Sequence, residues 1–184
     1  MKKIAVVFHS GYGHTLRMAQ AVAEGAGAQL IRIDADGNVS DGDWAALDAA
    51  DAIIMGSPTY MGSVSWQFKK FADASSKAWF AQKWKNKLFA GFTNSGSMNG
   101  DKLSTLHYLF TLAMQHGGLW VGTAMAPASA KAAQRSDINY LGSVCGAMAQ
   151  TPIDAGVDEM QSGDLETATL FGKRVAEAAD RLKS

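Results

Sequence analysis

An apolar run, followed at once by a glycine-containing loop and an amphipathic stretch, constrains the fold more than any other feature of this chain. Residues 4–8 read Ile-Ala-Val-Val-Phe, which is typical of a strand buried on both faces of a parallel sheet. The loop reads Ser-Gly-Tyr-Gly-His-Thr over residues 10–15, and from Leu16 apolar residues recur at helical spacing to about Gly27. A strand, a tight loop and a helix in this order predict the opening unit of an α/β sheet.

This first loop is predicted to bind an anion. Gly11 and Gly13 let the backbone turn tightly, and Ser10 and Thr15 carry hydroxyl groups. The following helix directs its unpaired N–H groups and the positive end of its dipole toward the same place. Because the loop contains no Lys or Arg, a phosphate would be held by N–H and hydroxyl groups, at roughly 1.5–3 kcal/mol for each hydrogen bond. A phosphate monoester fits such a loop.

Four more apolar runs predict further strands, at residues 30–33, 52–55, 88–92 and 119–121. Helices are predicted at 44–49, from Ser63 or Val64, at 101–116, and from a capping Ser162 onwards. Between the predicted strand at 119–121 and the helix that begins at Ser162, the segment 125–161 is long and irregular, as functional or mobile loops often are. Strands that alternate with helices predict a parallel sheet, and the length predicts a single domain over residues 1–184.

Composition narrows the range of partners. Seventeen basic and seventeen acidic residues give a formal net charge of zero, so nucleic acid and anionic membranes are poor partners and a small molecule is expected. Cys145 is the only cysteine, which excludes an intrachain disulfide and a multi-cysteine metal site and suits a reducing cytoplasm. His9 and His107 lack a second ligand at metal spacing, so no metal is expected. No segment reaches membrane-spanning length.

Three polar loops are predicted to meet at one edge of the sheet. They follow the first, third and fourth strands, at residues 10–15, 57–63 and 93–100, and all are rich in Gly, Ser, Thr or Asn. Ligands of open α/β sheets bind outside the carboxyl ends of the strands. A single flat ligand with a phosphate tail could therefore touch all three loops.

The motifs in these loops resemble those of a known family. Ser10 to Thr15, Gly56-Ser-Pro-Thr-Tyr-Met-Gly62, Asn94-Ser-Gly-Ser97 and Gln115-His-Gly117 together look like the flavodoxin-like FMN oxidoreductases. Within that family the chain is most similar to the NAD(P)H:quinone oxidoreductases once named for binding the tryptophan repressor. The resemblance implies a doubly wound, five-stranded parallel sheet of order 2-1-3-4-5, with helices on both faces.

The resemblance also implies a set of site residues. The first loop would hold the FMN phosphate, the loops after the third and fourth strands would surround the isoalloxazine ring, and His116 would approach the pyrimidine edge of that ring. Tyr12 would lie near the nicotinamide of NAD(P)H and Trp79 near the electron acceptor. The residues implied to bind FMN are Ser10, Gly11, Tyr12, Gly13, His14, Thr15, Pro58, Thr59, Tyr60, Met61, Gly62, Asn94, Ser95, Gly96, Ser97, Met98, Asn99 and His116.

Several of these residues have simpler explanations. Gly11 and Gly13 could open a dinucleotide-binding fingerprint, although Leu16 stands in place of its third glycine. His14 could be a polar residue of the first helical turn, and His116 could end its helix before a glycine cap. Trp79 could pack at a helix end or in a subunit interface.

The function that follows is transfer of two electrons from NAD(P)H through FMN to a quinone-like or other small acceptor, with no catalytic residue beyond the flavin. Met61 and Met98, rather than two stacked aromatic side chains, would leave a ring face open to the donor and acceptor. The alternatives are a one-electron flavodoxin-type carrier and a non-catalytic FMN-binding module. A homodimer or homotetramer is predicted from the apolar stretch 108–114, from Trp66, Trp79 and Trp84 near one helix, and from the long loop after Met125.

Overall fold

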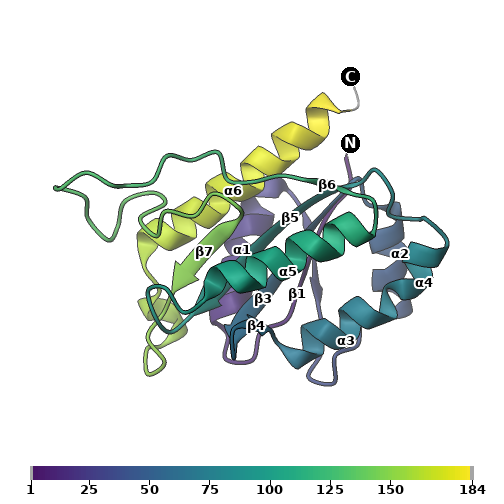
Figure 1. The fold of residues 1–184 in the computed structure, drawn as a ribbon, viewed down its shortest axis with the longest axis horizontal. Coiled ribbons are helices and arrows are strands. Elements are labelled where there is room, and N and C mark those ends of the chain that lie inside the picture. The colour runs from purple at the N-terminus through teal and green to yellow at the C-terminus, as the bar shows by residue number, and fades with distance from the viewer. Residues whose placement is uncertain (1, 183–184) are drawn as a thin grey trace.

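The structure, a computed structural model, describes residues 2–182 and is organised around one twisted sheet (Figure 1). The strands are β1 (Ile4–Phe8), β2 (Gln29–Arg32), β3 (Ala52–Tyr60), β4 (Ser63–Val64), β5 (Leu88–Ser95), β6 (Leu119–Trp120) and β7 (Ala147–Gln150). The helices are α1 (His14–Ala26), α2 (Asp41–Ala49), α3 (Trp66–Ala74), α4 (Ser76–Phe80), α5 (Lys102–Gln115), α6 (Ser162–Arg181) and the single 3₁₀ turn Val157–Glu159.

The sheet has the flavodoxin-like strand order that the family resemblance implies. Its parallel strands lie in the order β2-β1-β3-β5-β6, which is the predicted 2-1-3-4-5 with β4 counted separately. The short β4 pairs with the end of β3 in an antiparallel hairpin. The turn residues Met61 and Gly62 both have positive φ, at 48° and 77°, which matches the backbone twist of a two-residue hairpin.

The predicted helix start at Ser63 or Val64 is wrong, because these two residues form β4. Helix α3 begins at Trp66, and the Ser65 hydroxyl oxygen accepts a hydrogen bond from the Phe68 N–H as its N-cap. The final helix does begin at Ser162, but the N-cap position is Gln161, whose side chain makes no capping bond. Helix boundaries depend on such local hydrogen bonds, which a hydrophobic period does not reveal.

The fifth strand of the sheet is interrupted. β6 pairs with the beginning of β5 and β7 with its end, so that Leu88 faces Leu119 and Ser95 faces Gln150. Between β6 and β7 the chain leaves the sheet as a long loop that projects from the molecule (Figure 1). The predicted irregular segment 125–161 therefore contains a strand, and β7 returns the chain to the edge where the other strands end.

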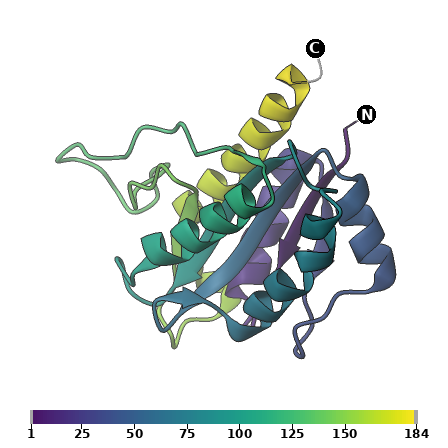
Figure 2. The same cartoon turned by 45° about the vertical axis from the view of Figure 1, so that its right-hand side comes forward.

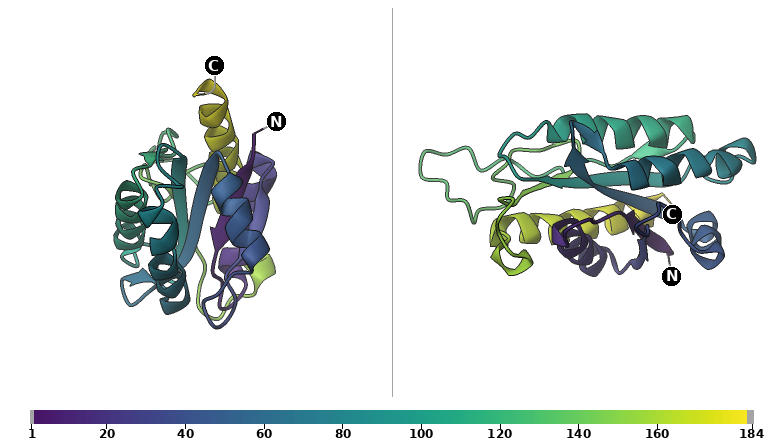
Figure 3. Two further views of the ribbon diagram at one scale, coloured as in Figure 1. Left: turned by 90° about the vertical axis from the view of Figure 1, so that its right-hand side faces the viewer. Right: turned by 90° about the horizontal axis from the view of Figure 1, so that it is seen from below.

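Helices cover both faces of the sheet (Figures 2 and 3). On one face, α1 and α6 pack over the side chains of Val6, Ile54 and Phe92. On the other, α3 and α5 pack over Val7, Ile53 and other residues of the same strands. Within residues 2–182, no helix combines the length and apolar character needed to cross a bilayer.

Glycines bring α1 and α6 into close contact. A Cβ atom on Gly25 of α1 would lie 1.9 Å from the Thr169 carbonyl oxygen of α6. In the reverse direction, a Cβ atom on Gly172 would lie 2.0 Å from the Val22 carbonyl oxygen. Since both obstacles are backbone atoms, neither can move out of the way alone. The two helices therefore touch through their main chains, which fixes α1 and the loop before it against α6.

We expect Gly25→Ala to lower the free energy of unfolding by about 2 kcal/mol, because the added methyl group forces the two helices apart. Gly42→Ala in α2 is the matched control, since its Cβ would meet only the Ser40 hydroxyl at 3.7 Å. Higher helix propensity should leave that variant at least as stable as the wild type. Urea unfolding followed by circular dichroism measures both changes. A Gly25→Ala variant as stable as the wild type would contradict the close helix contact.

Candidate functional site

The loop between β1 and α1 is held in shape by the Ser10 side chain. The Ser10 hydroxyl oxygen accepts hydrogen bonds from the N–H groups of Gly13 and Leu16, both at 3.1 Å. Gly13 has φ +97°, a conformation that disfavours any residue with a side chain. The Ser10 oxygen, predicted as a phosphate ligand, therefore acts within the loop, and only its own hydrogen is left to donate to a ligand.

The start of α1 leaves two donors unused. Arg17 N–H makes the first helical bond, to the Gly13 carbonyl at 2.9 Å. Within residues 2–182, the N–H groups of His14 and Thr15 find no acceptor. These two groups and the Thr15 hydroxyl lie at the positive end of the helix dipole, where an anion is stabilised.

A cavity of about 400 Å³ opens beside these donors, at the carboxyl ends of the strands. Most of its walls come from the three loops that the sequence predicts to meet. The lining residues are Tyr12, His14, Thr15, Pro58, Thr59, Tyr60, Asn94, Ser95, Gly96, Thr151 and Ile153.

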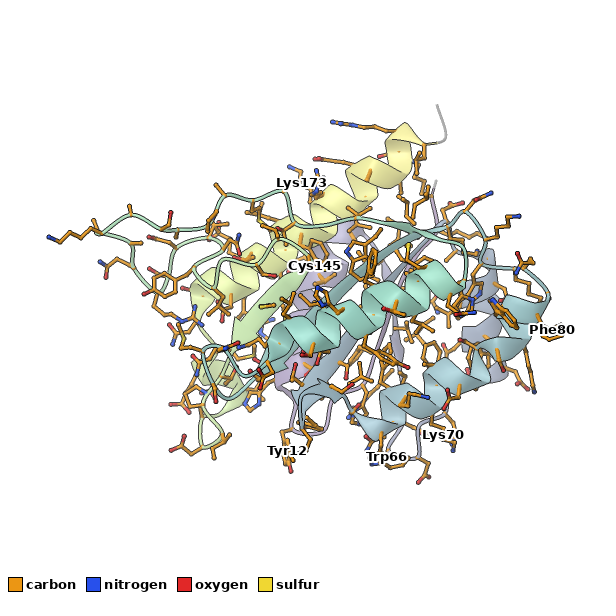
Figure 4. All side chains as sticks on the ribbon, viewed as in Figure 1. Tyr12, Trp66, Lys70, Phe80, Cys145 and Lys173 are labelled. Atoms are coloured by element: carbon orange, nitrogen blue, oxygen red, sulfur yellow. The ribbon has the colours of Figure 1, made fainter. Side chains whose placement is uncertain are left out.

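Two tyrosines stand at the mouth of this cavity. Tyr12 is 80% exposed, and its ring meets that of Tyr60 edge to face, with ring centres 6.4 Å apart. A Cβ atom on Gly11 would lie 2.8 Å from the Tyr60 hydroxyl, so the glycine makes room for this ring. Burial, and secondarily Tyr12, raises the pKa of Tyr60, which therefore remains a neutral phenol. Figure 4 shows Tyr12 projecting from the lower edge of the molecule.

Hydroxyl groups tie the floor of the cavity to the sheet. The Thr59 hydroxyl lies 2.8 Å from the hydroxyls of both Thr93 and Thr105, which joins β3, β5 and α5. On the other side of β3, the Ser65 hydroxyl bonds the buried His9 ring at 2.8 Å. Burial, with a smaller contribution from Arg32, lowers the pKa of His9, so this ring is a neutral hydrogen-bonding group. The loops that form the cavity thus rest on a fixed polar layer.

The fourth wall of the cavity, residues 150–157, was missed by the sequence reasoning. Thr151 donates to the Asn94 side-chain oxygen at 3.0 Å, and the Gln150 amide donates to the Gly96 carbonyl at 2.7 Å. His14, whose simpler explanation was a polar residue of the first helical turn, donates from Nε2 to the Ala155 carbonyl at 3.0 Å. Residues 147–150 read Ala-Met-Ala-Gln, which lacks the β-branched residues and the apolar–polar alternation of a strand, so no local signal in the sequence points to this wall.

Some predicted site residues lie outside the cavity lining. Met61 and Gly62 form the tip of the β3–β4 hairpin, where the Met61 side chain is fully exposed. The stretch from Ser97 to Asn99 continues beyond Gly96 on an exposed loop next to the cavity. The conformation of the first loop depends on Ser10, Gly11 and Gly13, which do not line the cavity themselves.

His116 and Trp79 are not brought to this cavity within one chain. α5 runs back along the strands and ends at Gln115, shortly before Leu119 pairs with the first residue of β5. His116 therefore lies at the opposite edge of the sheet, where it and Trp79 line a second cavity of about 240 Å³. Phe80, next to Trp79 in the chain, lies far from Tyr12 in Figure 4.

The His116 ring is buried with one nitrogen unused. Ser75 donates its hydroxyl hydrogen to the Ala72 carbonyl at 2.6 Å and accepts from His116 Nε2 at 2.9 Å. Nδ1 is then an acceptor, and it has no partner within residues 2–182. Burial lowers the pKa of His116 to about 4, so the ring is neutral at physiological pH.

We expect the His116 ring to remain neutral down to about pH 4, which its NMR titration measures directly. Because the pKa is lower in the folded state than the usual value near 6.5, the unfolded chain binds more protons between these values. The stability that this group contributes is therefore complete above pH 6.5 and is lost as the pH falls toward 4, by at most about 3 kcal/mol. His116→Asn should abolish this part of the acid sensitivity. A ring that protonates near pH 6.5 would contradict the burial.

Comparison with known proteins places the chain in a family. Residues 44–134 match the family described as NADPH-dependent FMN reductase. Over 182 residues, and 99% of both proteins, the chain is 54% identical to the flavodoxin FldP of Pseudomonas aeruginosa. It is 31% identical over 99% of its length to an NAD(P)H dehydrogenase (quinone) of Archaeoglobus fulgidus, of which it covers 100%.

A solved structure agrees with this assignment. The crystal structure described as the flavodoxin, WrbA-like protein from Agrobacterium tumefaciens is 57% identical, with a TM-score of 0.81. The alignment covers 98% of this chain and 99% of that one. Similarity of this degree along almost the whole chain shows that the two proteins share one fold. The chain therefore belongs to the flavodoxin-like FMN reductase family.

Proposed function

We propose that this protein binds FMN non-covalently in the cavity at the carboxyl ends of its strands and transfers electrons through it. The observation that carries the proposal is the pair of unused N–H donors, on His14 and Thr15, beside a cavity with two tyrosines at its mouth. A loop of N–H and hydroxyl donors without Lys or Arg suits a phosphate monoester, and a cavity of about 400 Å³ with aromatic side chains at its mouth suits a flavin ring.

The chain's own residues would divide the work of holding this cofactor. The Thr15 hydroxyl and the N–H groups at the start of α1 would donate to the phosphate. Pro58, Thr59 and Tyr60 would border the ring on one side, with Asn94 to Gly96 on the other. Thr151 and Ile153 would close the remaining wall and exclude water. Bound FMN supplies the redox chemistry itself, and the protein supplies position and electrostatics.

The first candidate function is electron transfer of the flavodoxin type. The relatives that are 54% and 57% identical both carry the name flavodoxin. The rim of the cavity also suits a protein partner, because Tyr12, Met61 and Ile153 are largely exposed around it. An electron donor or acceptor protein could thus approach the edge of the bound ring.

The second candidate is two-electron transfer from NAD(P)H to a quinone-like acceptor. Relatives near 30% identity carry the name NAD(P)H dehydrogenase (quinone), and the unused acceptor on His116 favours a further ligand contact. Since His116 and Trp79 lie at the edge opposite the FMN cavity, they would reach a flavin only in another copy of the chain. This candidate therefore includes a homodimer or homotetramer.

We expect Thr15→Val to weaken FMN binding by about 1–2 kcal/mol, or roughly five- to thirtyfold, because one hydrogen bond to a charged group is lost. Thr15→Ser keeps the hydroxyl and is the matched control. Riboflavin, which lacks the phosphate, should bind the wild type much more weakly and respond little to either variant. Flavin fluorescence quenching measures all three, and equal affinity for FMN and riboflavin would refute the assignment of the first loop.

Anaerobic addition of NADPH to the FMN-loaded protein separates the two candidates. A carrier should keep its visible flavin absorbance with stoichiometric NADPH and lose it in steps with a one-electron reductant. The second candidate predicts complete bleaching by one equivalent of NADPH, an oligomer by light scattering, and slower turnover in Trp79→Ala. If NADPH bleaches the flavin and the protein is a monomer of 19.5 kDa, the flavin site is not shared between two copies of the chain. Failure to bind FMN would refute both candidates.

A further inference from the structure

Lys102, the first residue of α5, is a completely buried cation beneath the loop that continues from the cavity. Its ammonium donates to three successive carbonyl oxygens, those of Ser97 at 2.6 Å, Met98 at 2.8 Å and Asn99 at 3.1 Å. A buried charge is costly unless such acceptors surround it. The lysine and the loop therefore depend on one another.

The three carbonyl contacts set the direction of the loop's donors. No peptide bond in the described residues is cis, and in a trans peptide the carbonyl oxygen and the next N–H point in opposite directions. Because the carbonyls of residues 97–99 turn toward the ammonium, the N–H groups of Met98, Asn99 and Gly100 turn away from it. Within residues 2–182, none of these three N–H groups donates to an acceptor. The loop thus presents a row of unused donors beside Gly96, which lines the cavity.

The charge of Lys102 is not cancelled by a direct ion pair. The nearby Asp164 carboxylate is bound through both oxygens by Arg135 and also accepts from the Gln150 N–H at 2.9 Å. In the part of the chain that the structure describes, no carboxylate lies within ion-pair distance of Lys102. Burial lowers the pKa of Lys102 to about 8, with Asp164 raising it and Arg135 lowering it. The ammonium is therefore mainly charged at neutral pH.

Given the proposed FMN site, we propose that Lys102 is a positioning residue that favours the binding of reduced over oxidised flavin. It turns the N–H groups of residues 98–100 outward and places a positive charge behind them. A flavin ring gains negative charge on its pyrimidine edge when it is reduced. Donors and a fixed charge that are arranged beforehand stabilise that charge without reorganisation. The three carbonyls hold the ammonium in place, and the ammonium holds the loop.

The test compares Lys102→Met, Lys102→Arg and the exposed control Lys69→Met with the wild type. For each, FMN binding to the apoprotein gives the affinity for oxidised flavin, and the midpoint potential of bound FMN gives the relative affinity for reduced flavin. Lys102→Met should weaken the binding of reduced flavin at least tenfold more than that of oxidised flavin, which corresponds to about 30 mV for two electrons. Lys102→Arg should keep most of the wild-type preference for reduced flavin. The control Lys69→Met should bind both redox states as the wild type does.

The outcomes are distinguishable. If Lys102 has a purely structural role, Lys102→Met weakens the binding of oxidised and reduced flavin equally and leaves the midpoint potential unchanged. That result overturns the inference. If Lys102→Met does not fold, wild type and Lys102→Arg are compared at pH 6.5 and 9.5. Only the wild-type lysine should lose its charge in this range, so its potential should fall below that of Lys102→Arg at the higher pH, and parallel potentials overturn the inference. A wild type that binds no FMN refutes the proposed function instead.

Discussion

The parallel alignment of β1, β3 and β5 is the constraint on which the rest of this molecule depends. Their hydrogen-bonded register brings Phe8, Gly56 and Phe92 side by side, so the chain leaves the sheet on the same side three times. Polar loops that are 30 or more residues apart in the sequence then share one small volume. The cavity follows from this alignment, because the first loop and the last residues of β3 and β5 meet at one edge of the sheet.

The same geometry separates the two polar sites. A helix that follows a parallel strand must return the chain to the opposite edge, so the end of α5 lies at the amino ends of the strands. His116 therefore sits far from the loop of residues 94–99 that precedes its own helix. The two cavities of one chain belong to opposite edges, and assembly of several copies is the route by which they would meet.

Buried polar groups give the loops around the main cavity their fixed shape. Ser10 organises the first loop, Thr59 joins two strands and a helix, and Lys102 gathers three carbonyls. The ion pair of Arg135 with Asp164 anchors β7 to the beginning of α6. Ser10, Lys102 and Asp164 bond backbone groups and Thr59 bonds two hydroxyls, so loops without regular structure are tied to the sheet and helices.

The sequence by itself determined the alternation of strands and helices, because hydrophobic periods and turn residues act locally. The resemblance of its loop motifs to a known family implied the strand order, and the anion site in the first loop stays a prediction. It also identified nine of the eleven residues that line the cavity. Only the tertiary structure placed Thr151 and Ile153 in the wall, since β7 is recognisable as a strand only once it pairs with the end of β5. It alone also revealed the buried Lys102, because the burial of a side chain depends on contacts between distant segments. The structure placed His116 and Trp79 in a cavity at the other edge, in agreement with the return of a helix that follows a parallel strand and against the position that the resemblance implied.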